Sequence, residues 1–278
     1  MRVFYQKSKL NTSKNKILAK SIGLVPTMGA LHEGHIMLVK RALEDNELVL
    51  VSIFVNPTQF NDPDDLKNYP KTLESDLQKL EKLKGNIWVY APNASDLYLE
   101  SIKAKPFNFG ALESTMEGAN RKGHFEGVAT IVQKLFEALE PTSAYFGEKD
   151  FQQLKIVSAL VEKEKIPVKI VPCPIIRHSD GLAMSSRNRL LTPKHRAMAP
   201  IIYETLQKAL ALKEKYSPDQ IESWIIGFFE LHPEFELEYF TIADAESLQK
   251  ITILNGTKNR AFIAVKLGNV RLIDNIKF

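Results

Sequence analysis

Cysteine is nearly absent from this sequence, and long apolar runs are absent altogether. Among 278 residues the one cysteine is Cys173, which lies between two prolines in an apolar stretch. One thiol can form no disulfide within the chain and cannot supply a zinc site, so we expect a reducing compartment and a buried, unreactive side chain. Because no apolar run approaches about 18 residues and no leader pattern opens the chain, we expect a cytoplasmic protein that does not cross a membrane.

A strong excess of charge of either sign is also missing. The chain has 37 Lys and Arg residues against 33 Asp and Glu residues, a net charge of +4, and the lysines are spread along its length. A nucleic-acid-binding surface would concentrate basic residues and interleave them with aromatic residues, and the sequence shows no such stripe. The composition therefore predicts a globular chain of one large or two smaller domains, with no nucleic-acid partner.

Short apolar runs alternate with longer amphipathic ones over the first two thirds of the chain. The apolar runs are rich in Val and Ile and nearly continuous, which is typical of strands that are covered on both faces. Predicted strands lie at 22–27, 48–55, 87–92, 143–147 and 168–176, and predicted helices at 34–45, 73–84, 126–140 and 149–164. This alternation predicts an α/β fold with a Rossmann-like parallel sheet and helices on both of its faces.

The pattern changes after residue 176. Two helices are predicted at 192–215 and 217–231, each opened by a hydroxyl residue and a proline, followed by strands at 235–243 and 261–274 with a Gly-Asn turn at 268–269. We therefore expect two domains. Residues 1–176 form the Rossmann-like domain that binds nucleotide and substrate, and residues 177–278 form a smaller α+β domain that closes over the active site.

The stretch Val-Pro-Thr-Met-Gly-Ala-Leu-His-Glu-Gly-His-Ile-Met, residues 25–37, carries two histidines, His32 and His35, between a predicted strand and a predicted helix. Gly29 and Gly34 allow the backbone to approach a ligand closely, and a helix start favours an anion, so the pattern indicates phosphate binding. A zinc-protease motif needs histidines four residues apart in a helix, whereas these are three apart beside a glycine. A strand–helix turn with surface histidines is the alternative.

Polar side chains follow two other predicted strands. Asn56 and Gln59 come after the strand at 48–55, and amides at this edge suit recognition of a small polar substrate. In Phe-Gly-Glu-Lys-Asp-Phe-Gln-Gln-Leu, residues 146–154, Lys149 can neutralise phosphate charge. The two adjacent glutamines of this stretch face different directions on a helix, so one of them is expected to line the cleft. An ordinary turn is the alternative for the first segment, and in the second Asp150 could simply cap the helix.

Two polar segments complete the set. In Arg-His-Ser-Asp-Gly-Leu-Ala-Met-Ser-Ser-Arg-Asn-Arg-Leu-Leu-Thr-Pro, residues 177–193, two serines beside Arg187 suit a triphosphate clamp, and a turn with a helix cap is the alternative. Residues 116–130 carry two basic residues, a histidine and three glycines, which favours a flexible lid or an interface loop. We expect His124 in this segment to be structural and not catalytic.

Six stretches together resemble one family. They are VPTMGALHEGH, VSIFVNPTQF, GANRKGHFEGVATIVQKLF, FGEKDFQQL, DGLAMSSRN and RLIDN, and from residue 25 onward they follow the order and spacing of the pantoate–β-alanine ligases, also called pantothenate synthetases. His32, Gly34 and His35 are also similar to the phosphate-binding signature of the wider nucleotidylyltransferase superfamily, and MSSRN resembles its mobile second signature. The resemblance covers nearly the whole chain except about the first twenty residues.

The resemblance implies an ATP-dependent ligase of vitamin B5 and coenzyme A biosynthesis. Pantoate attacks the α-phosphate of ATP to give pantoyl adenylate and pyrophosphate, and β-alanine then displaces AMP to give pantothenate. Mg²⁺ accompanies the ATP phosphates, although the resemblance names no protein ligands for it. It further implies a homodimer formed through the N-terminal domain, with small molecules as the other partners.

The resemblance also assigns roles to individual residues. ATP binding falls to Met28, Gly29, Ala30, Leu31, His32, Glu33, Gly34, His35, Gly147, Glu148, Lys149, Asp150, Ile176, Met184, Ser185, Ser186 and Arg187. The catalytic set is His35 as proton donor, with His32, Lys149, Ser185, Ser186 and Arg187. Pantoate is assigned to Gln59, Gln153 and Asn56, and β-alanine to Gln59.

Two other functions compete with this assignment. A nucleotidylyltransferase that makes a dinucleotide or a cytidylyl product would share the histidine turn, but it has no evident need for Gln59 and Gln153. A catalytically inactive nucleotide-binding or RNA-binding module would be expected to lack a phosphate-contacting residue. His35, Lys149 and Arg187 are all present.

Overall fold

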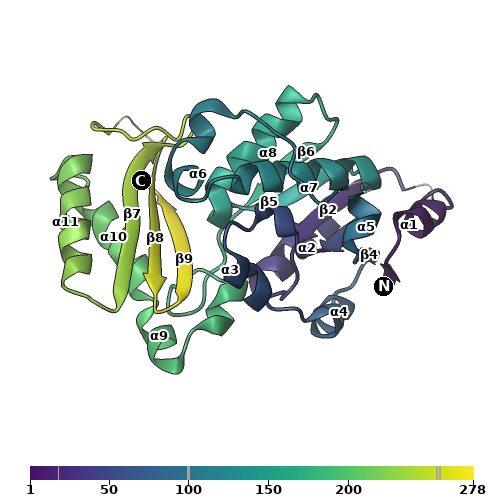
Figure 1. Ribbon diagram of the computed structural model, residues 1–278, viewed down its shortest axis with the longest axis horizontal. Helices are drawn as coiled ribbons and strands as arrows, with labels where there is room; N and C mark the ends of the chain where they lie inside the picture. Colours follow the sequence, from purple (N-terminus) through teal and green to yellow (C-terminus); the bar gives the residue numbers. More distant parts are fainter. Residues whose placement is uncertain (18, 99–100, 255, 257) are drawn as a thin grey trace.

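Two sheets of different kinds make up the structure (Figure 1). The computed structural model describes residues 1–278 except 18, 99–100, 255 and 257. A six-stranded sheet has the order β1-β4-β3-β2-β5-β6 and is parallel at every pairing, and a three-stranded antiparallel sheet has the order β7-β8-β9. The α/β class and the smaller α+β part predicted from the sequence are confirmed.

The larger sheet has one strand more than the sequence pattern predicted. Its strands are β1 (Arg2–Phe4), β2 (Ile22–Thr27), β3 (Leu48–Ile53), β4 (Ile87–Tyr90), β5 (Ser143–Gly147) and β6 (Lys169–Cys173). The smaller sheet contains β7 (Phe235–Asp244), β8 (Asn259–Leu267) and β9 (Val270–Lys277). The extra strand is β1, which pairs with β4 at one edge of the sheet and precedes the first predicted strand at 22–27. Three residues are too few for a periodic pattern to reveal.

Helices cover both faces of the larger sheet. They are α1 (Lys7–Lys14), α2 (Glu33–Asp45), α3 (Pro63–Asn68), α4 (Leu73–Glu81), α5 (Ala94–Leu97), α6 (Met116–Asn120), α7 (His124–Leu139) and α8 (Phe151–Lys163) in the larger part. The smaller part has α9 (Pro193–Met198), α10 (Ile201–Leu212) and α11 (Pro218–Glu230). No helix in the described part of the chain is long and apolar enough to cross a membrane. Four short 3₁₀ turns are η1 (Pro57–Gln59), η2 (Gly110–Glu113), η3 (Glu148–Asp150) and η4 (Ser186–Leu190).

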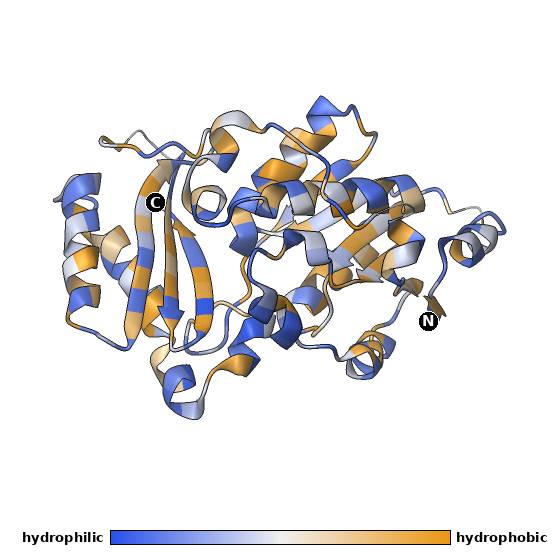
Figure 2. Cartoon of the chain, in the orientation of Figure 1, coloured by the Kyte–Doolittle hydropathy of each residue, from blue (hydrophilic) through white to orange (hydrophobic). Residues whose placement is uncertain are grey.

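The alternation of side chains along β3 shows how the two faces are filled. Leu48 and Leu50 pack into a core shared with α7 and α8, whereas Val49 and Val51 pack into a second core with α2 and α4. Successive side chains of a strand point to opposite faces, so a strand covered on both sides needs apolar residues at every position. The inner strands of the larger sheet are correspondingly hydrophobic, and the outer helices are mixed (Figure 2).

The smaller sheet has its own core, on the face covered by α10 and α11, with β9 lying nearest the larger part (Figure 1). The Gly268–Asn269 turn between β8 and β9 is confirmed, with Gly268 in the left-handed region at φ 59°. The single helix predicted at 192–215 is wrong. It divides into α9 and α10 at Pro200, which has no N–H to continue the hydrogen-bond ladder.

The flexible loop predicted at 116–130 is also wrong. Residues 116–120 form α6, and α7 begins at His124. The Glu117 carboxylate accepts hydrogen bonds from Arg271 Nη1 and Nη2, both at 2.7 Å, and from Tyr239 Oη at 2.7 Å. Burial alone would raise the pKa of Glu117, but the hydrogen bonds and charge of Arg271, together with Tyr239 and Arg121, outweigh it and lower the pKa to about 2. This segment is therefore an internal interface between the two parts of the chain.

Helix α7 passes so close to η1 that a side chain at Gly127 has no room. A Cβ added there would lie 2.2 Å from the carbonyl oxygen of Thr58, whereas one added at Gly227 in α11 would meet nothing within 4 Å. We expect Gly127→Ala to lower the free energy of unfolding by about 1–3 kcal/mol, because α7 must move off η1.

Gly227→Ala is the matched control. It should leave that free energy unchanged or raise it by up to about 1 kcal/mol, because alanine favours a helix over glycine. Urea unfolding of both variants measures the difference in their free energies of unfolding. Equal urea midpoints for Gly127→Ala and Gly227→Ala would show that the close approach of α7 to η1 does not require glycine at position 127.

Candidate active site

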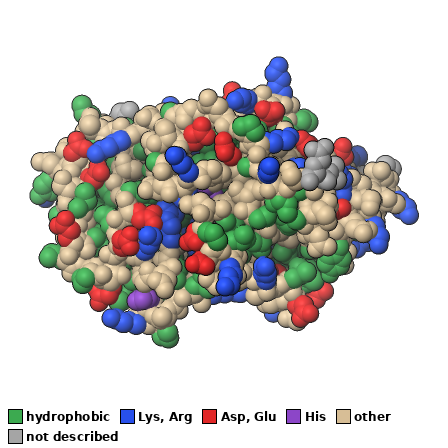
Figure 3. All heavy atoms as spheres, in the orientation of Figure 1, with side chains coloured by type: hydrophobic (Ala, Val, Ile, Leu, Met, Phe, Trp, Pro, Cys, Tyr) green, Lys and Arg blue, Asp and Glu red, His purple; other side chains and the backbone are tan. Residues whose placement is uncertain are grey.

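A cavity of about 230 Å³ lies at the carboxyl edge of the parallel sheet. Residues that follow β2, β3, β5 and β6 line it. The neighbours β2 and β5 lead to strands on opposite sides, so the cavity lies at the switch point where open α/β sheets bind ligands. A larger cleft of about 1210 Å³ adjoins it between the two sheets. On this face acidic and basic side chains gather where the two parts meet (Figure 3).

The turn between β2 and α2 is held by a buried carboxylate. Gly29 and Ala30 have φ of 83° and 49°, which is the left-handed region. The Asp76 carboxylate accepts the N–H of Ala30 at 2.8 Å and the N–H of Leu31 at 2.7 Å, and its side chain is 0% exposed. Two backbone donors that would otherwise be orphaned in the core are thereby satisfied. Sequence reasoning placed this residue in a helix but gave it no function.

The carbonyl side of the same turn is bonded to other segments. Ser186 Oγ donates to the Ala30 carbonyl at 3.0 Å. The Leu31 carbonyl accepts from Lys79 Nζ at 2.6 Å and from Arg189 Nη2 at 3.2 Å. The segment around η4 therefore lies across the turn and is fastened to its backbone.

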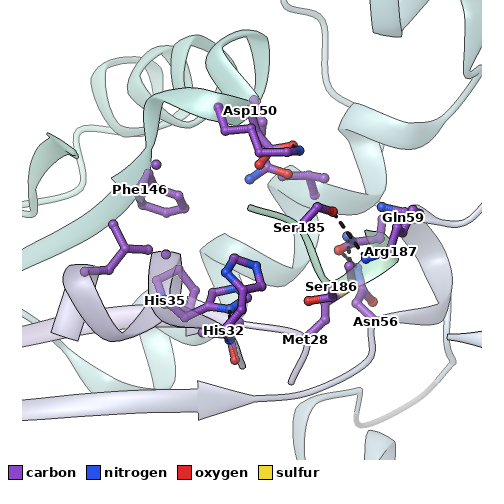
Figure 4. Close-up of a pocket in the computed structure, with 18 of the residues that line it drawn as sticks. Met28, His32, His35, Asn56, Gln59, Phe146, Asp150, Ser185, Ser186 and Arg187 are labelled. Carbon is purple, nitrogen blue, oxygen red and sulfur yellow. Dashed lines mark hydrogen bonds and ion pairs between the residues drawn. The ribbon is translucent and has the colours of Figure 1, made fainter. Parts of the chain in front are cut away.

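His32 and His35 lie side by side on the cavity wall (Figure 4), with their ring centroids 4.0 Å apart. His35 Nδ1 accepts the N–H of His32 at 3.3 Å, which leaves the proton of a neutral ring on Nε2. Burial lowers the pKa of His32 to about 2 and that of His35 to about 4, and at His35 the nearby Asp150 carboxylate opposes this shift only in part. Both rings are therefore neutral at physiological pH and act as oriented hydrogen-bonding groups.

Gly34 leaves the space that the His32 ring occupies. A Cβ at this position would lie 2.9 Å from both Cε1 and Nδ1 of that ring. The two histidines and the glycine between them are therefore one packed unit. The spacing of the two histidines argues against zinc. The sequence also predicts that the backbone at Gly34 approaches a ligand closely, whereas in the structure it approaches the His32 ring.

Asn56 is buried and fully used by the protein. Its Nδ2 donates to Gln59 Oε1 and to the Gly127 carbonyl, both at 3.1 Å, and its Oδ1 accepts from Tyr98 Oη at 2.6 Å. Gln59 is thus held by its oxygen, while its Nε2 lies 3.1 Å from the sulfur of Met28 at the cavity wall. Asn56 therefore orients Gln59, whose side chain lines the cavity.

The two adjacent glutamines of α8 face different ways, as the sequence predicted. Gln152 is buried, accepts the N–H of Glu117 at 3.0 Å and donates to the carbonyls of Leu112 and Thr115. Gln153 lines the cavity. Gln152 therefore fixes the segment at the start of α6, and Gln153 contributes to the cavity wall.

The two cationic side chains predicted for the site, Lys149 and Arg187, line the cavity, and each lies beside a carboxylate. Lys149 lies 3.6 Å from the neighbouring Asp150 carboxylate, and both side chains are part of the cavity wall. Arg187 donates from Nε at 3.3 Å and Nη2 at 2.7 Å to the carboxylate of Asp65 in α3. A guanidinium has five N–H donors, so this pair leaves three of them for an anion.

The structure brings most of the predicted site residues together. The cavity wall includes Met28, His32, Gly34, His35, Asn56, Gln59, Gly147, Lys149, Asp150, Gln153, Ile176, Met184, Ser185, Ser186 and Arg187. The predicted ATP-binding residues outside that wall are Gly29, Ala30, Leu31, Glu33 and Glu148. The first three form the buried turn, Glu33 pairs with Lys40 at 3.3 Å, and Glu148 pairs with Arg260 at 2.9 Å.

Some residues of the wall were missed. Arg121 and His124 line the cavity, and His124 Nδ1 lies 2.7 Å from the carbonyl of Gln59. Burial, reinforced by Arg121, lowers the pKa of His124 to about 4. The structural role expected for His124 is consistent with this contact. Because a loop was predicted here, Arg121 was not assigned to the site. The amphipathic helix that begins at His124 is the sequence signal that would have placed Arg121 next to the cavity.

The connection between the two sheets is part of the same wall. Pro174, Ile175 and Ile176 follow β6 directly and line the cavity. The carbonyl of Ile176 accepts the N–H of Met184 at 2.9 Å, so the chain turns back on itself before η4. Among the residues that the structure describes, no group of three or more His, Cys, Asp or Glu side chains could hold a metal ion.

Comparison with known proteins shows the family of this chain. The family model for pantoate-beta-alanine ligase matches residues 2–277. A pantothenate synthetase from Christiangramia forsetii is 50% identical over 279 residues, 99% of each chain, and one from Flavobacterium psychrophilum is 53% identical over 258 residues, 92% of each chain. The chain belongs to the pantoate–β-alanine ligase family.

Solved structures of this family share the fold over the full length. A pantothenate synthetase from Thermus thermophilus has a TM-score of 0.93 at 36% identity, with 100% of this chain and 99% of that chain covered. A pantoate-beta-alanine ligase from Francisella tularensis, complexed with beta-gamma ATP and beta-alanine, has a TM-score of 0.84 at 36% identity, with 100% and 97% covered. The family resemblance deduced from the six sequence stretches is confirmed.

The packing of His32 over Gly34 can be tested separately from folding. Gly34 is in α2 with φ outside the left-handed region, so Gly34→Ala should leave thermal unfolding unchanged or raise its midpoint. The added methyl group displaces the His32 ring, and we expect ATP affinity measured by calorimetry to fall about tenfold or more, comparable to the loss of one charge-assisted hydrogen bond. Unchanged ATP affinity would show that the space left by Gly34 for the His32 ring is not needed for ATP binding.

Proposed function

We propose that the cavity joins pantoate to β-alanine by way of a pantoyl adenylate formed from ATP. The chain is a ligase of the pantoate–β-alanine family, and its reaction is the ATP-dependent condensation of these two acids. The observation that carries the assignment is the convergence of neutral histidines, Lys149, Arg187 and two glutamines on one cavity at the sheet's switch point. Neither competing function explains the two amides.

The first step is the attack of a pantoate carboxylate oxygen on the α-phosphorus of ATP, with pyrophosphate leaving. Such a transfer needs positioning and charge stabilisation and no covalent protein nucleophile. Lys149 and the free donors of Arg187 neutralise phosphate charge, and Ser185 and Ser186 sit at the start of η4 beside them. His35 donates from Nε2 as a neutral ring, and His32 lies against it.

In the second step the β-alanine amine attacks the acyl carbon and AMP leaves. Gln59 and Gln153 hold pantoate through their amides, and Gln59 also contacts β-alanine. Asn56 acts through Gln59, because its own hydrogen-bonding groups are occupied by protein partners. The apolar wall formed by Val128, Ile131 and Val132 limits water, which would hydrolyse the adenylate.

Magnesium with the ATP phosphates is part of this proposal. Mg²⁺ commonly binds through one or two carboxylates together with substrate phosphates. Asp150 on the cavity wall would be its protein ligand, and the ion would supply further charge neutralisation.

The domain boundary, assembly and location also belong to the proposal. The boundary falls at 176–177, which is supported by the separate cores on the two sides of that point. A homodimer through the N-terminal domain and a cytoplasmic location follow from the family resemblance and remain predictions.

The reaction is tested by incubating the protein with ATP, Mg²⁺ and pantoate, with and without β-alanine. We expect AMP release that depends on β-alanine, and pantoyl adenylate that accumulates when β-alanine is omitted, because the amine is the acceptor of the second step. Chromatography of the nucleotides measures both. Equal AMP release without β-alanine, or a preference for a cytidine nucleotide, would overturn the assignment.

The role of His35 is tested by replacing it with asparagine or with glutamine, whose side-chain amides differ in reach. Glutamine can place its amide N–H near the position of Nε2, whereas asparagine can replace only Nδ1. We expect His35→Asn to slow adenylate formation by about 100-fold or more, as loss of a transition-state donor does, and His35→Gln to retain most of the rate.

Single-turnover measurement of pantoyl adenylate gives these rates directly. If the two variants were equally impaired, the donor would not be at Nε2, and if both kept the wild-type rate, His35 would leave the catalytic set.

A further inference from the structure

Asn275 in β9 is a buried polar residue to which the proposed reaction gives no role. It ends the Arg-Leu-Ile-Asp-Asn stretch that the sequence resemblance included without a function. The residue is 1% exposed, so its amide must find partners within the protein. Those partners lie in η3, the short turn after β5 that carries Lys149.

Both N–H groups of the Asn275 side chain are directed at η3. Nδ2 donates to the carbonyl of Glu148 at 3.0 Å and to the carbonyl of Lys149 at 2.9 Å. Its Oδ1 accepts a short hydrogen bond from Arg260, and its main-chain carbonyl accepts from Arg177 Nη2 at 3.3 Å. The amide is therefore fixed on one side and grips the backbone of the turn on the other.

The turn itself has little local support. It is three residues long and follows Gly147, which has no side chain to cap it. Arg260 gives it a second attachment, donating from Nη2 to Glu148 Oε2 at 2.9 Å while its guanidinium lies 4.0 Å from the ring centroid of Phe151. Strands β8 and β9 of the smaller sheet thus hold a turn whose lysine lines a cavity at the edge of the larger sheet.

We propose that Asn275 is a positioning residue for Lys149, fixing the two carbonyls of η3 so that the ammonium group points into the cavity. This rests on the proposed function in one respect, namely that Lys149 acts on a phosphate. The geometry separates this role from general stabilisation, because the two contacts are made to the residue that carries the lysine and to the one before it.

Asn275→Asp is the sharpest variant, since it keeps the shape of the side chain and the acceptor for Arg260 but removes both N–H donors to η3. Asn259→Asp is its matched control. Asn259 lies in β8 of the same sheet, is 2% exposed and donates to the Gly256 carbonyl at 3.2 Å, away from η3. Thermal unfolding of Asn275→Asp and Asn259→Asp measures how much stability each variant loses, so that effects on the reaction can be compared at similar stability.

The kinetic test is a single-turnover measurement of pantoyl adenylate, combined with Lys149→Ala in a double-mutant cycle. We expect Asn275→Asp to lower the rate about tenfold or more with KM for pantoate nearly unchanged, and Asn259→Asp to stay within about twofold of wild type. In the Lys149→Ala background Asn275→Asp should change the rate by less than about twofold, because its effect passes through the lysine. An equal loss in both backgrounds overturns the proposal.

A second readout does not depend on the reaction. Lys149 and Lys155 have side chains that are 18% and 21% exposed, so acylation of both can be followed by mass spectrometry with Lys155 as internal reference. Loosening of η3 in Asn275→Asp should raise the labelling rate of Lys149 about threefold or more relative to Lys155, with no change in Asn259→Asp. An unchanged ratio of Lys149 to Lys155 labelling overturns the positioning role of Asn275. Absence of pantoyl adenylate in the wild type would overturn the proposed function instead, and the labelling ratio would still test the positioning role.

Discussion

The carboxylate of Asp76 is the interaction on which the rest of the site depends. It lies in α4, outside the cavity, yet it satisfies the two backbone donors exposed by the left-handed turn at Gly29 and Ala30. With the N–H groups of that turn fixed on one side, its carbonyls face the other way and are taken by Ser186, Lys79 and Arg189. One buried charge thereby sets where α2 begins and what can lie across it.

Two groups of side chains contribute differently to the electrostatics of the cavity, because burial keeps one group neutral. His32 and His35 lose their affinity for a proton and serve as neutral, oriented rings, so the positive charge comes from Lys149, Arg187 and Arg121. Each of these cations lies near a carboxylate, which limits the repulsion among them. A polyanionic nucleotide then meets charges held in place by partners, and this reduces the reorganisation needed on binding.

Much of the fold and site followed from local patterns. Nearly continuous apolar runs identified five of the six parallel strands, and the polar residues that follow three of them line one cavity, because parallel strands share an edge. Other features depend on distant partners. Asp76 reads as one of several acids in an amphipathic helix until the turn 45 residues away is placed beside it. Arg121 and Tyr98 belong to segments whose own sequences resemble loops, and the family resemblance could assign Ala30 or Glu148 to ATP without knowing which atoms face inward.

The stretch from Pro174 to Ile176 is at once a wall of the cavity and part of the covalent link between the two sheets. Any rotation of the smaller sheet about this link carries the wall with it. The shape of the cavity therefore depends on the relative orientation of the two sheets, because one segment serves both as wall and as connection.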